Sequence, residues 1–169
     1  EQGNAILNYL KASGADLLCL QEYATGTDRK RHLMQKEIEE ALEAYPYHAI
    51  TNIGGNSGHA NKLACYSKFP ILSARPVAYD SHYNGSVIYR IRVGEDTLTV
   101  INNHLESNKL TKQDKVVYEE LLSVPEKEKM RSGMKQLVKK LAEASAIRAE
   151  QADTLAKVLQ RVTDGKVIV

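Results

Sequence analysis

Polar side chains stand at the ends of apolar stretches in this sequence, and their types suit chemistry on phosphate groups. Glu22 follows the apolar run 15–20, and a carboxylate at the end of a buried strand suits a hard cation such as Mg²⁺. Asn102 and His104 close the run 98–105 and share one side of a strand, because residues i and i+2 point the same way. An imidazole can donate to a phosphoryl oxygen or move a proton, and the Asn amide can hold the imidazole or bind the same phosphate.

Asn61 is a further candidate, and each candidate also has a simpler interpretation. Asn61 follows a loop of small residues and precedes the apolar run 62–67, so it can reach a phosphate or only satisfy turn backbone. Glu22 can equally be a strand-end carboxylate in water, and His104 a structural histidine that closes a strand. Spacing alone leaves both interpretations open.

Arg90 would be an attractive phosphate clamp, but strand register argues against it. A two-residue turn at 94–95 sets Arg90 opposite Thr99. That face points away from His104, so Arg90 is not a candidate. We interpret Arg148 and Gln151, one helical turn apart, as structural residues that pack a long helix.

Short strands between helices must position these side chains. Apolar periodicity and turn residues predict the elements. We expect helices over 4–11, 28–45, 111–122 and 126–162, the last as two helices or one bent helix, and strands over 15–22, 47–53, 62–67, 71–79, 86–93, 98–105 and 166–169. The run 86–93 and the run 98–105 form the clearest hairpin.

Composition excludes several classes of protein. The 169 residues carry 23 Lys and Arg against 21 Asp and Glu, a formal net charge of +2, which is too small an excess for a dedicated nucleic-acid coat or a polybasic membrane tail. No apolar run approaches the ~20 residues of a membrane span, and no signal peptide is visible. The sequence leaves the cellular compartment unknown.

The sequence around the two cysteines says little about their function. Cys19 and Cys65 both lie inside apolar runs, which favours buried small hydrophobic residues. No Cys-x-x-Cys pair or Cys/His cluster is present, so we expect no structural zinc. Nothing in their spacing favours a disulfide between them, and the question stays open.

Taken together, four segments in order resemble the endonuclease/exonuclease/phosphatase superfamily of deoxyribonuclease-like phosphoesterases. The run ADLLCLQE ending at Glu22 resembles the family's "aDIi-lQE" strand. Three further segments are similar to its "g-aIlSryPI" turn, its "v-nTHL-s" strand and its "R--Qa" helix; they are 61–71, 100–107 and 148–152. No single motif is highly specific, but four in the right order make coincidence improbable.

The resemblance implies a fold and a reaction. It implies an α+β fold, a two-sheet β-sandwich flanked by helices (α/β/β/α), and hydrolysis of a phosphodiester or phosphomonoester by metal-assisted water attack. By similarity Glu22 is the metal ligand for Mg²⁺ or Mn²⁺, and His104 with Asn102 acts on the scissile phosphate. Asn61 is expected to bind phosphate. The substrate is a phosphorylated nucleic acid, phospholipid or small molecule.

Parts of the family pattern are not matched. The family's first strand, its GDFN segment and its closing SDH segment have no match in the sequence, so we expect residues 1–169 to form a single partial domain that lacks the first and last strands. Such a fragment should bind a divalent ion weakly and be inactive alone, because one carboxylate cannot build an octahedral site. We also expect exposed sheet edges that an oligomer or another chain covers.

Two other interpretations compete with the hydrolase. The first is a non-catalytic binding module of the same fold, against which Glu22 and His104 argue mildly. The second is a nucleotide-binding α/β protein, which ranks last because no glycine-rich phosphate loop follows a strand.

Overall fold

A computed structural model describes residues 4–26, 33–54, 61–81, 83–123, 127–162 and 165–169. They form two compact units. The first, here called the sandwich unit, contains the described residues up to His104 and those from Val162 onward. The second, the helical unit, is Leu105–Arg161. Whether residues 1–169 are one domain stays a prediction.

The elements follow the predicted order closely. The helices are α1 (Ala5–Ala12), α2 (Gln35–Ala41), α3 (Lys112–Ser123) and α4 (Lys127–Leu159). The strands are β1 (Leu17–Leu20), β2 (Tyr47–Gly54), β3 (Asn61–Ser67), β4 (Ile71–Val77), β5 (Gly85–Val93), β6 (Asp96–His104) and β7 (Lys166–Ile168). None of the described helices combines the length and apolar character that crossing a bilayer requires.

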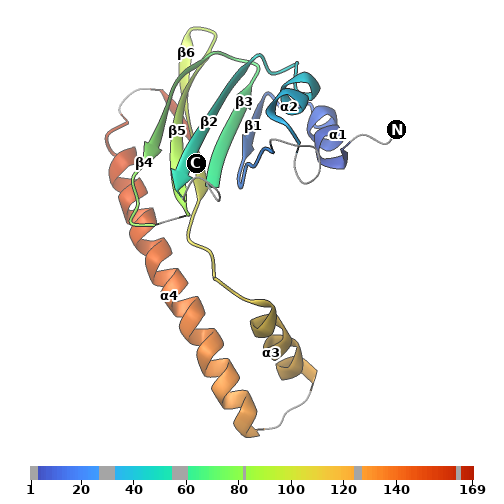
Figure 1. The fold of residues 1–169 in the computed structure, drawn as a ribbon. Helices are drawn as coiled ribbons and strands as arrows, with labels where there is room; N and C mark the ends of the chain where they lie inside the picture. Colours follow the sequence, from blue (N-terminus) through green and yellow to red (C-terminus); the bar gives the residue numbers. More distant parts are fainter. Residues whose placement is uncertain (1–3, 27–32, 55–60, 82, 124–126, 163–164) are drawn as a thin grey trace. The chain divides into compact units, whose positions relative to one another are not determined.

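The strands form two sheets, which confirms the predicted α+β class (Figure 1). One sheet has the order β1-β3-β2 and the other β4-β5-β6-β7. Every described pairing is antiparallel except that of β6 with β7, which is parallel. The β5–β6 hairpin turns at 94–95 and sets Arg90 opposite Thr99, as the sequence predicted.

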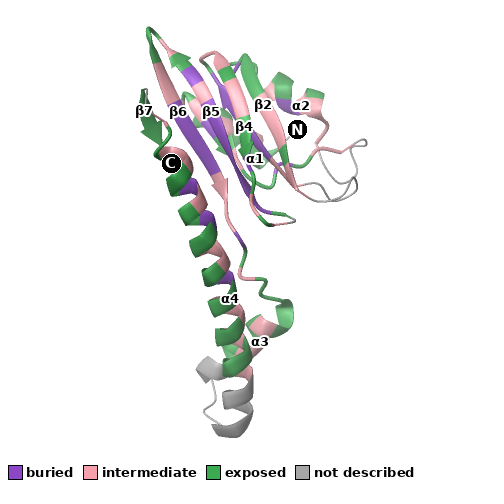
Figure 2. Ribbon diagram, turned by 90° about the vertical axis from the view of Figure 1, so that its left-hand side faces the viewer, coloured by how far each residue is buried: buried purple, intermediate pink, exposed green. Residues whose placement is uncertain are grey.

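Alternation along the strands builds a core on each face of the first sheet. In β3, Leu63 and Cys65 pack against Val87, Tyr89 and Ile91 of the second sheet. The neighbouring positions of β3, Ala64 and Tyr66, face the other way and pack with residues of α2. Helices α1 and α2 therefore cover the outer face of this sheet (Figure 1), and Figure 2 shows buried residues at the centres of the strands.

Two predictions about local structure were wrong. The helix expected over 28–45 is reduced to α2, with positions 28–32 outside the described residues. Cys19 was expected to be buried but is exposed, whereas Cys65 is buried. The reason is the sheet order: β1 is the end strand of its sheet among the described residues, and β3 is central.

In the helical unit, α4 is one helix of 33 residues, where the sequence left open two helices or a bend. Lys140 Nζ binds a carboxylate oxygen of Asp114 at 2.6 Å. This bond, with those from Thr111, holds the pKa of Asp114 at about 2. Arg148 and Gln151 are structural, as predicted: Arg148 donates to the carbonyl oxygen of Glu106, and the Glu106 amide donates to Gln151.

Two buried tyrosines give a matched test of the core. The Tyr66 hydroxyl lies 2.8 Å from that of Tyr23 and accepts a bond from Gln35. The Tyr89 hydroxyl is buried with no hydrogen-bond partner among the described residues, although the amide of Asn102 approaches it. Burial raises the pKa of Tyr89.

We expect Tyr66→Phe to lower the free energy of unfolding by about 1–2 kcal/mol, because it removes two hydrogen bonds at a buried site. Tyr89→Phe should change it by less than about 0.5 kcal/mol, because the hydroxyl it removes is unpaired. Urea unfolding of the two variants provides the comparison. Equal losses in both would contradict this description of the core.

Candidate active site

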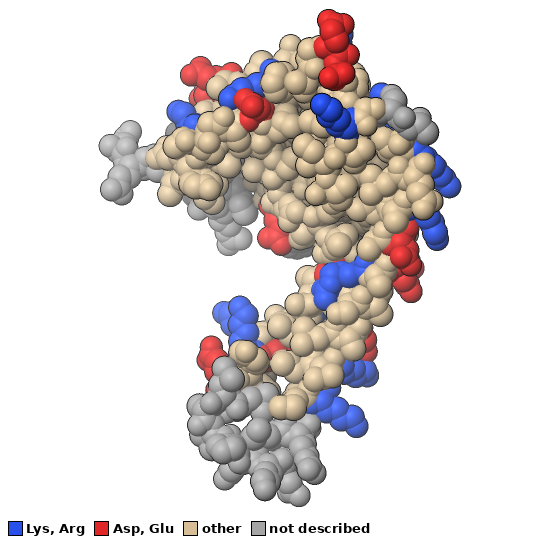
Figure 3. All heavy atoms as spheres, turned by 180° about the vertical axis from the view of Figure 1, so that it is seen from behind, with Lys and Arg blue, Asp and Glu red and all other residues tan. Residues whose placement is uncertain are grey.

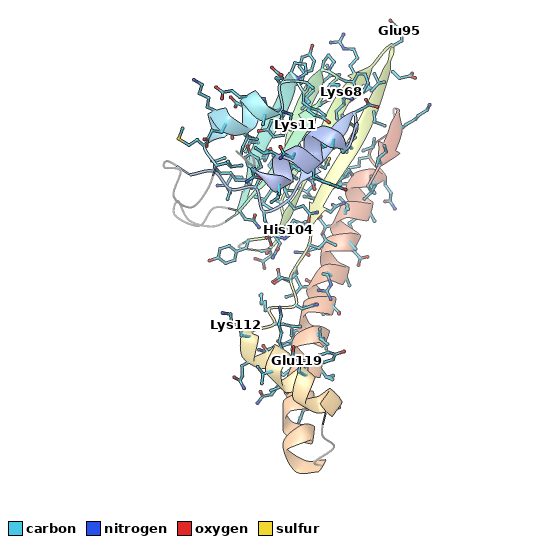
Figure 4. All side chains as sticks on the ribbon, turned by 90° about the vertical axis from the view of Figure 1, so that its right-hand side faces the viewer. Lys11, Lys68, Glu95, His104, Lys112 and Glu119 are labelled. Carbon is cyan, nitrogen blue, oxygen red and sulfur yellow. The ribbon has the colours of Figure 1, made fainter. Side chains whose placement is uncertain are left out.

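Strand pairing brings the predicted site residues to one end of the sandwich unit. Because β1 runs antiparallel to β3, the end of β1 lies beside the start of β3, where Asn61 stands. In the second sheet, the β5–β6 register sets Gly85 opposite His104. Figure 4 shows His104 at the end of β6 remote from Glu95 in the hairpin turn.

Two side-chain hydrogen bonds tie the ends of β1 and β6 together across the two sheets. The amide of Gln21 donates to the carbonyl oxygen of Asn103. In the opposite direction, the amide of Asn102 donates to the carbonyl oxygen of Leu20 at 3.2 Å. We call this pair of bonds the reciprocal clamp. It fixes the strand that leads into Glu22 against the strand that ends in His104.

The backbone at Glu22 is held in an unusual conformation. Its φ of 50° lies in the left-handed region, which costs a residue other than glycine about 1–2 kcal/mol. The neighbours on both sides impose it: Gln21 belongs to the clamp, and the backbone amide of Tyr23 donates to the carbonyl oxygen of Lys62 at 2.9 Å. Strain of this kind is found at functional sites, but Lys109 has the same φ, and a functional Glu22 stays a prediction.

Asn61 orients the imidazole of His104. Its amide nitrogen lies 2.6 Å from the carbonyl oxygen of Tyr83 and 3.0 Å from Nδ1 of His104. Because a carbonyl oxygen only accepts, the Tyr83 contact fixes which end of the amide points this way. The same nitrogen then donates to Nδ1, so the proton of the neutral imidazole resides on Nε2.

The Nε2 atom of His104 faces Glu22. It lies 3.5 Å from a carboxylate oxygen of Glu22. The imidazole is 17% exposed and the carboxylate 78%, so one partner is anchored in the fold and the other reaches into solvent. When the imidazole is protonated, the contact is an ion pair with a highly exposed member, and it contributes about 0–1 kcal/mol to stability.

The structure places the two asparagines differently. Asn102 is only 4% exposed and donates to the Leu20 carbonyl oxygen, whereas Asn61 contacts the imidazole. The expected role of Asn102 at the scissile phosphate stays a prediction. The expected contact of Asn61 with phosphate stays a prediction.

The sequence did not predict the roles of Gln21 and Tyr83, which hold the site together through hydrogen bonds. Gln21 directly precedes Glu22 and matches the Q of the family's "aDIi-lQE" strand, which was the available signal. Tyr83 acts through its backbone carbonyl, and a backbone group leaves no residue-type signal in a sequence.

Glu22 is the residue predicted to hold a divalent ion, and its chemistry can be compared with that prediction. The exposed carboxylate of Glu22 is the hard oxygen ligand that Mg²⁺ prefers, and Mg²⁺ commonly keeps waters and substrate phosphate as its other ligands. The described part of the chain contains no group of three or more His, Cys, Asp or Glu side chains arranged to hold a metal. Glu22 therefore fits as a single ligand.

Comparison with known proteins agrees with the architecture. The model of the endonuclease/exonuclease/phosphatase family matches residues 1–169. The chain belongs to this family. The resemblance seen in the four sequence segments is thereby confirmed. No match was found among the curated proteins.

Solved structures of the endonuclease/exonuclease/phosphatase family are also similar. TDP2 from Caenorhabditis elegans is 20% identical, with 72% of this chain and 37% of that chain covered and a TM-score of 0.43. The family protein from Beutenbergia cavernae is 17% identical, with 70% and 38% covered and a TM-score of 0.46. ANGEL2, a 2′,3′-cyclic phosphatase, is 22% identical, with 73% and 39% covered and a TM-score of 0.43. This chain spans less than two thirds of the length of each.

The tautomer of His104 is directly measurable. Long-range ¹H–¹⁵N NMR should find the neutral imidazole protonated on Nε2, because Asn61 donates to Nδ1. In Asn61→Ala the population protonated on Nδ1 should increase, since that nitrogen loses its donor. A wild-type imidazole protonated on Nδ1 would contradict the described geometry.

Proposed function

We propose that the protein hydrolyses a phosphodiester or phosphomonoester by metal-assisted attack of water. The observation that carries this proposal is the approach of Glu22 to His104, 3.5 Å apart although they come from different sheets. A hard carboxylate ligand beside an N–H donor is the pair of groups that a phosphate ester needs. Membership of the endonuclease/exonuclease/phosphatase family supports the reaction class.

His104 is proposed as the residue that contacts the substrate phosphate. With Asn61 donating to Nδ1, the Nε2–H group is directed outward, where it can donate to a phosphoryl oxygen as negative charge develops there. Its 3.5 Å separation from Glu22 leaves the N–H available to a closer acceptor.

Glu22 is proposed as the carboxylate that holds Mg²⁺ or Mn²⁺. When bound, the ion supplies Lewis-acid stabilisation of charge on the phosphate. The strained turn and the reciprocal clamp hold Glu22 in place before any ligand arrives, which lowers the cost of ordering the site. Asn102, in the clamp, is proposed as a positioning residue.

The surface charge bears on the substrate class. Basic and acidic side chains are interspersed on the face of the molecule in Figure 3, and the formal net charge is only +2. A long nucleic acid bound along its backbone needs a continuous basic surface, and the small net charge gives little support for one. The substrate proposed here is therefore defined by its phosphate ester, in a small molecule, a phospholipid or a nucleic acid.

Glu22→Gln in the full-length protein should lower Mg²⁺-dependent turnover of an aryl phosphodiester or phosphomonoester by about two to three orders of magnitude, because it removes a ligand charge at equal size. His104→Gln should lower kcat by about two orders of magnitude or more. Initial-rate kinetics on each ester give both numbers.

Glu95→Gln is the matched control. Glu95 is an exposed carboxylate in the turn at the opposite end of the β5–β6 hairpin (Figure 4), so its loss should leave turnover unchanged. Wild-type rates in a folded Glu22→Gln variant would remove Glu22 from the site. A wild-type protein that binds phosphate esters without turning them over would replace this proposal with the non-catalytic binding module.

A further inference from the structure

The two cysteines are partners across a strand pair. The register of β1 with β3 sets Cys19 directly opposite Cys65, although 45 residues separate them in the sequence. Both are free thiols. Their spacing in the sequence did not favour a disulfide between them. The antiparallel pairing of their strands does.

One backbone hydrogen bond shows whether Cys19 and Cys65 form a hydrogen-bonded or a non-hydrogen-bonded strand pair. The backbone amide of Lys68 donates to the carbonyl oxygen of Asp16 at 3.0 Å, which makes these opposed residues a hydrogen-bonded pair. Hydrogen-bonded and non-hydrogen-bonded pairs alternate along an antiparallel ladder. Three positions further along, Cys19 and Cys65 therefore form a non-hydrogen-bonded pair. Cα atoms in such pairs lie about 4.5 Å apart, at the short end of the range that a disulfide spans.

Both thiols are on the same face of the sheet. Leu17, two positions before Cys19, packs in the layer between the sheets, and Cys65 belongs to that layer. Since side chains two apart on a strand point to the same side, Cys19 points there as well. The register and the shared face place the two thiols beside each other, and each shifts the pKa of the other.

The two thiols differ in accessibility and in acidity. Cys19 is exposed and Cys65 is buried. The neighbouring Cys65 thiol, as a hydrogen-bond donor, lowers the pKa of Cys19. The contact with Cys19 and burial raise the pKa of Cys65. An exposed thiol with the larger thiolate fraction is the one that attacks an external disulfide, and the buried thiol can then resolve the product.

We infer that Cys19 and Cys65 form a reactive dithiol site, which low-molecular-weight disulfides such as oxidised glutathione convert to an intramolecular disulfide. This inference is independent of the proposed hydrolase activity. It assigns a modification site to the pair of β1 with β3, where one cysteine is exposed and its partner is buried.

The reaction balances in two exchange steps. The Cys19 thiolate attacks one sulfur of oxidised glutathione, the glutathione S–S bond breaks, and the released thiolate takes a proton from water. The Cys65 thiol then loses its proton to water and attacks the Cys19 sulfur, which breaks the mixed disulfide and releases the second glutathione as a thiolate that takes a proton from water. Two protein thiols are oxidised, and one glutathione disulfide is reduced to two thiols.

The test uses the native full-length protein incubated with oxidised glutathione, quenched by alkylation and mapped by peptide mass spectrometry. Wild-type protein should yield the cross-linked peptide that joins Cys19 to Cys65. Cys65→Ser should stop at glutathione attached to Cys19, because the resolving thiol is absent. Cys19→Ser should leave Cys65 reduced, because no reagent reaches it.

Two results would overturn the inference. One is a wild-type protein that accumulates glutathione on Cys19 while Cys65 stays reduced. The other is a protein whose thiols react only after denaturation. Both are read on the wild-type chain, so the test holds even if a substitution at the buried Cys65 prevents folding. Cys65→Ala then serves as a second variant that places no hydroxyl in the core.

Discussion

The candidate site depends on the reciprocal clamp between the ends of β1 and β6. Gln21 donates from one strand to the other, and Asn102 donates back. Each strand belongs to a different sheet, and apolar packing between sheets is not directional enough to fix where two strand ends meet. The clamp supplies that direction. Glu22 and His104 then approach each other as a consequence of where their strands stop.

The order of exposure across the site follows from the same arrangement. Asn102 is buried in the clamp, His104 is mostly covered, and Glu22 projects into solvent. Asn61 comes from the start of β3 and fixes the imidazole from its far side. A substrate phosphate arriving from solvent would therefore meet a side chain already oriented by the protein, which is the condition under which electrostatic stabilisation is most effective.

The strands and the polar residues at their ends were predictable, because the alternation of apolar and polar residues and the position where a strand ends are local properties of the sequence. The hairpin register that pairs Ile91 with Leu98 follows from a two-residue turn. The choice of Glu22 and His104 as neighbours came from the family resemblance. The partner of each amide was not predictable, because it depends on what the opposite sheet places beside it: Leu20 of β1 beside Asn102, and His104 of β6 beside Asn61.

Dependence on three-dimensional neighbours also explains why the exposure of Cys19 and the turn at Glu22 were not predicted. Cys19 and Cys65 lie in similar apolar runs, yet only one is buried, because exposure depends on the order of strands in the sheet. The left-handed turn at Glu22 could not be predicted either, because glycine is the usual sequence signal for such a turn and this position is not a glycine.

The most direct test of the account is the effect of Mn²⁺ on the histidine NMR signals of the full-length protein. A paramagnetic ion bound by Glu22 would lie next to His104, so the His104 imidazole signals should broaden at the lowest Mn²⁺ concentrations. The signals of His48, whose Nε2 lies 3.4 Å from the carboxylate of Glu39, provide an internal comparison. Glu22→Gln should abolish the selective broadening. Equal broadening of the two histidines, or broadening of His104 that persists in Glu22→Gln, would contradict the central claim.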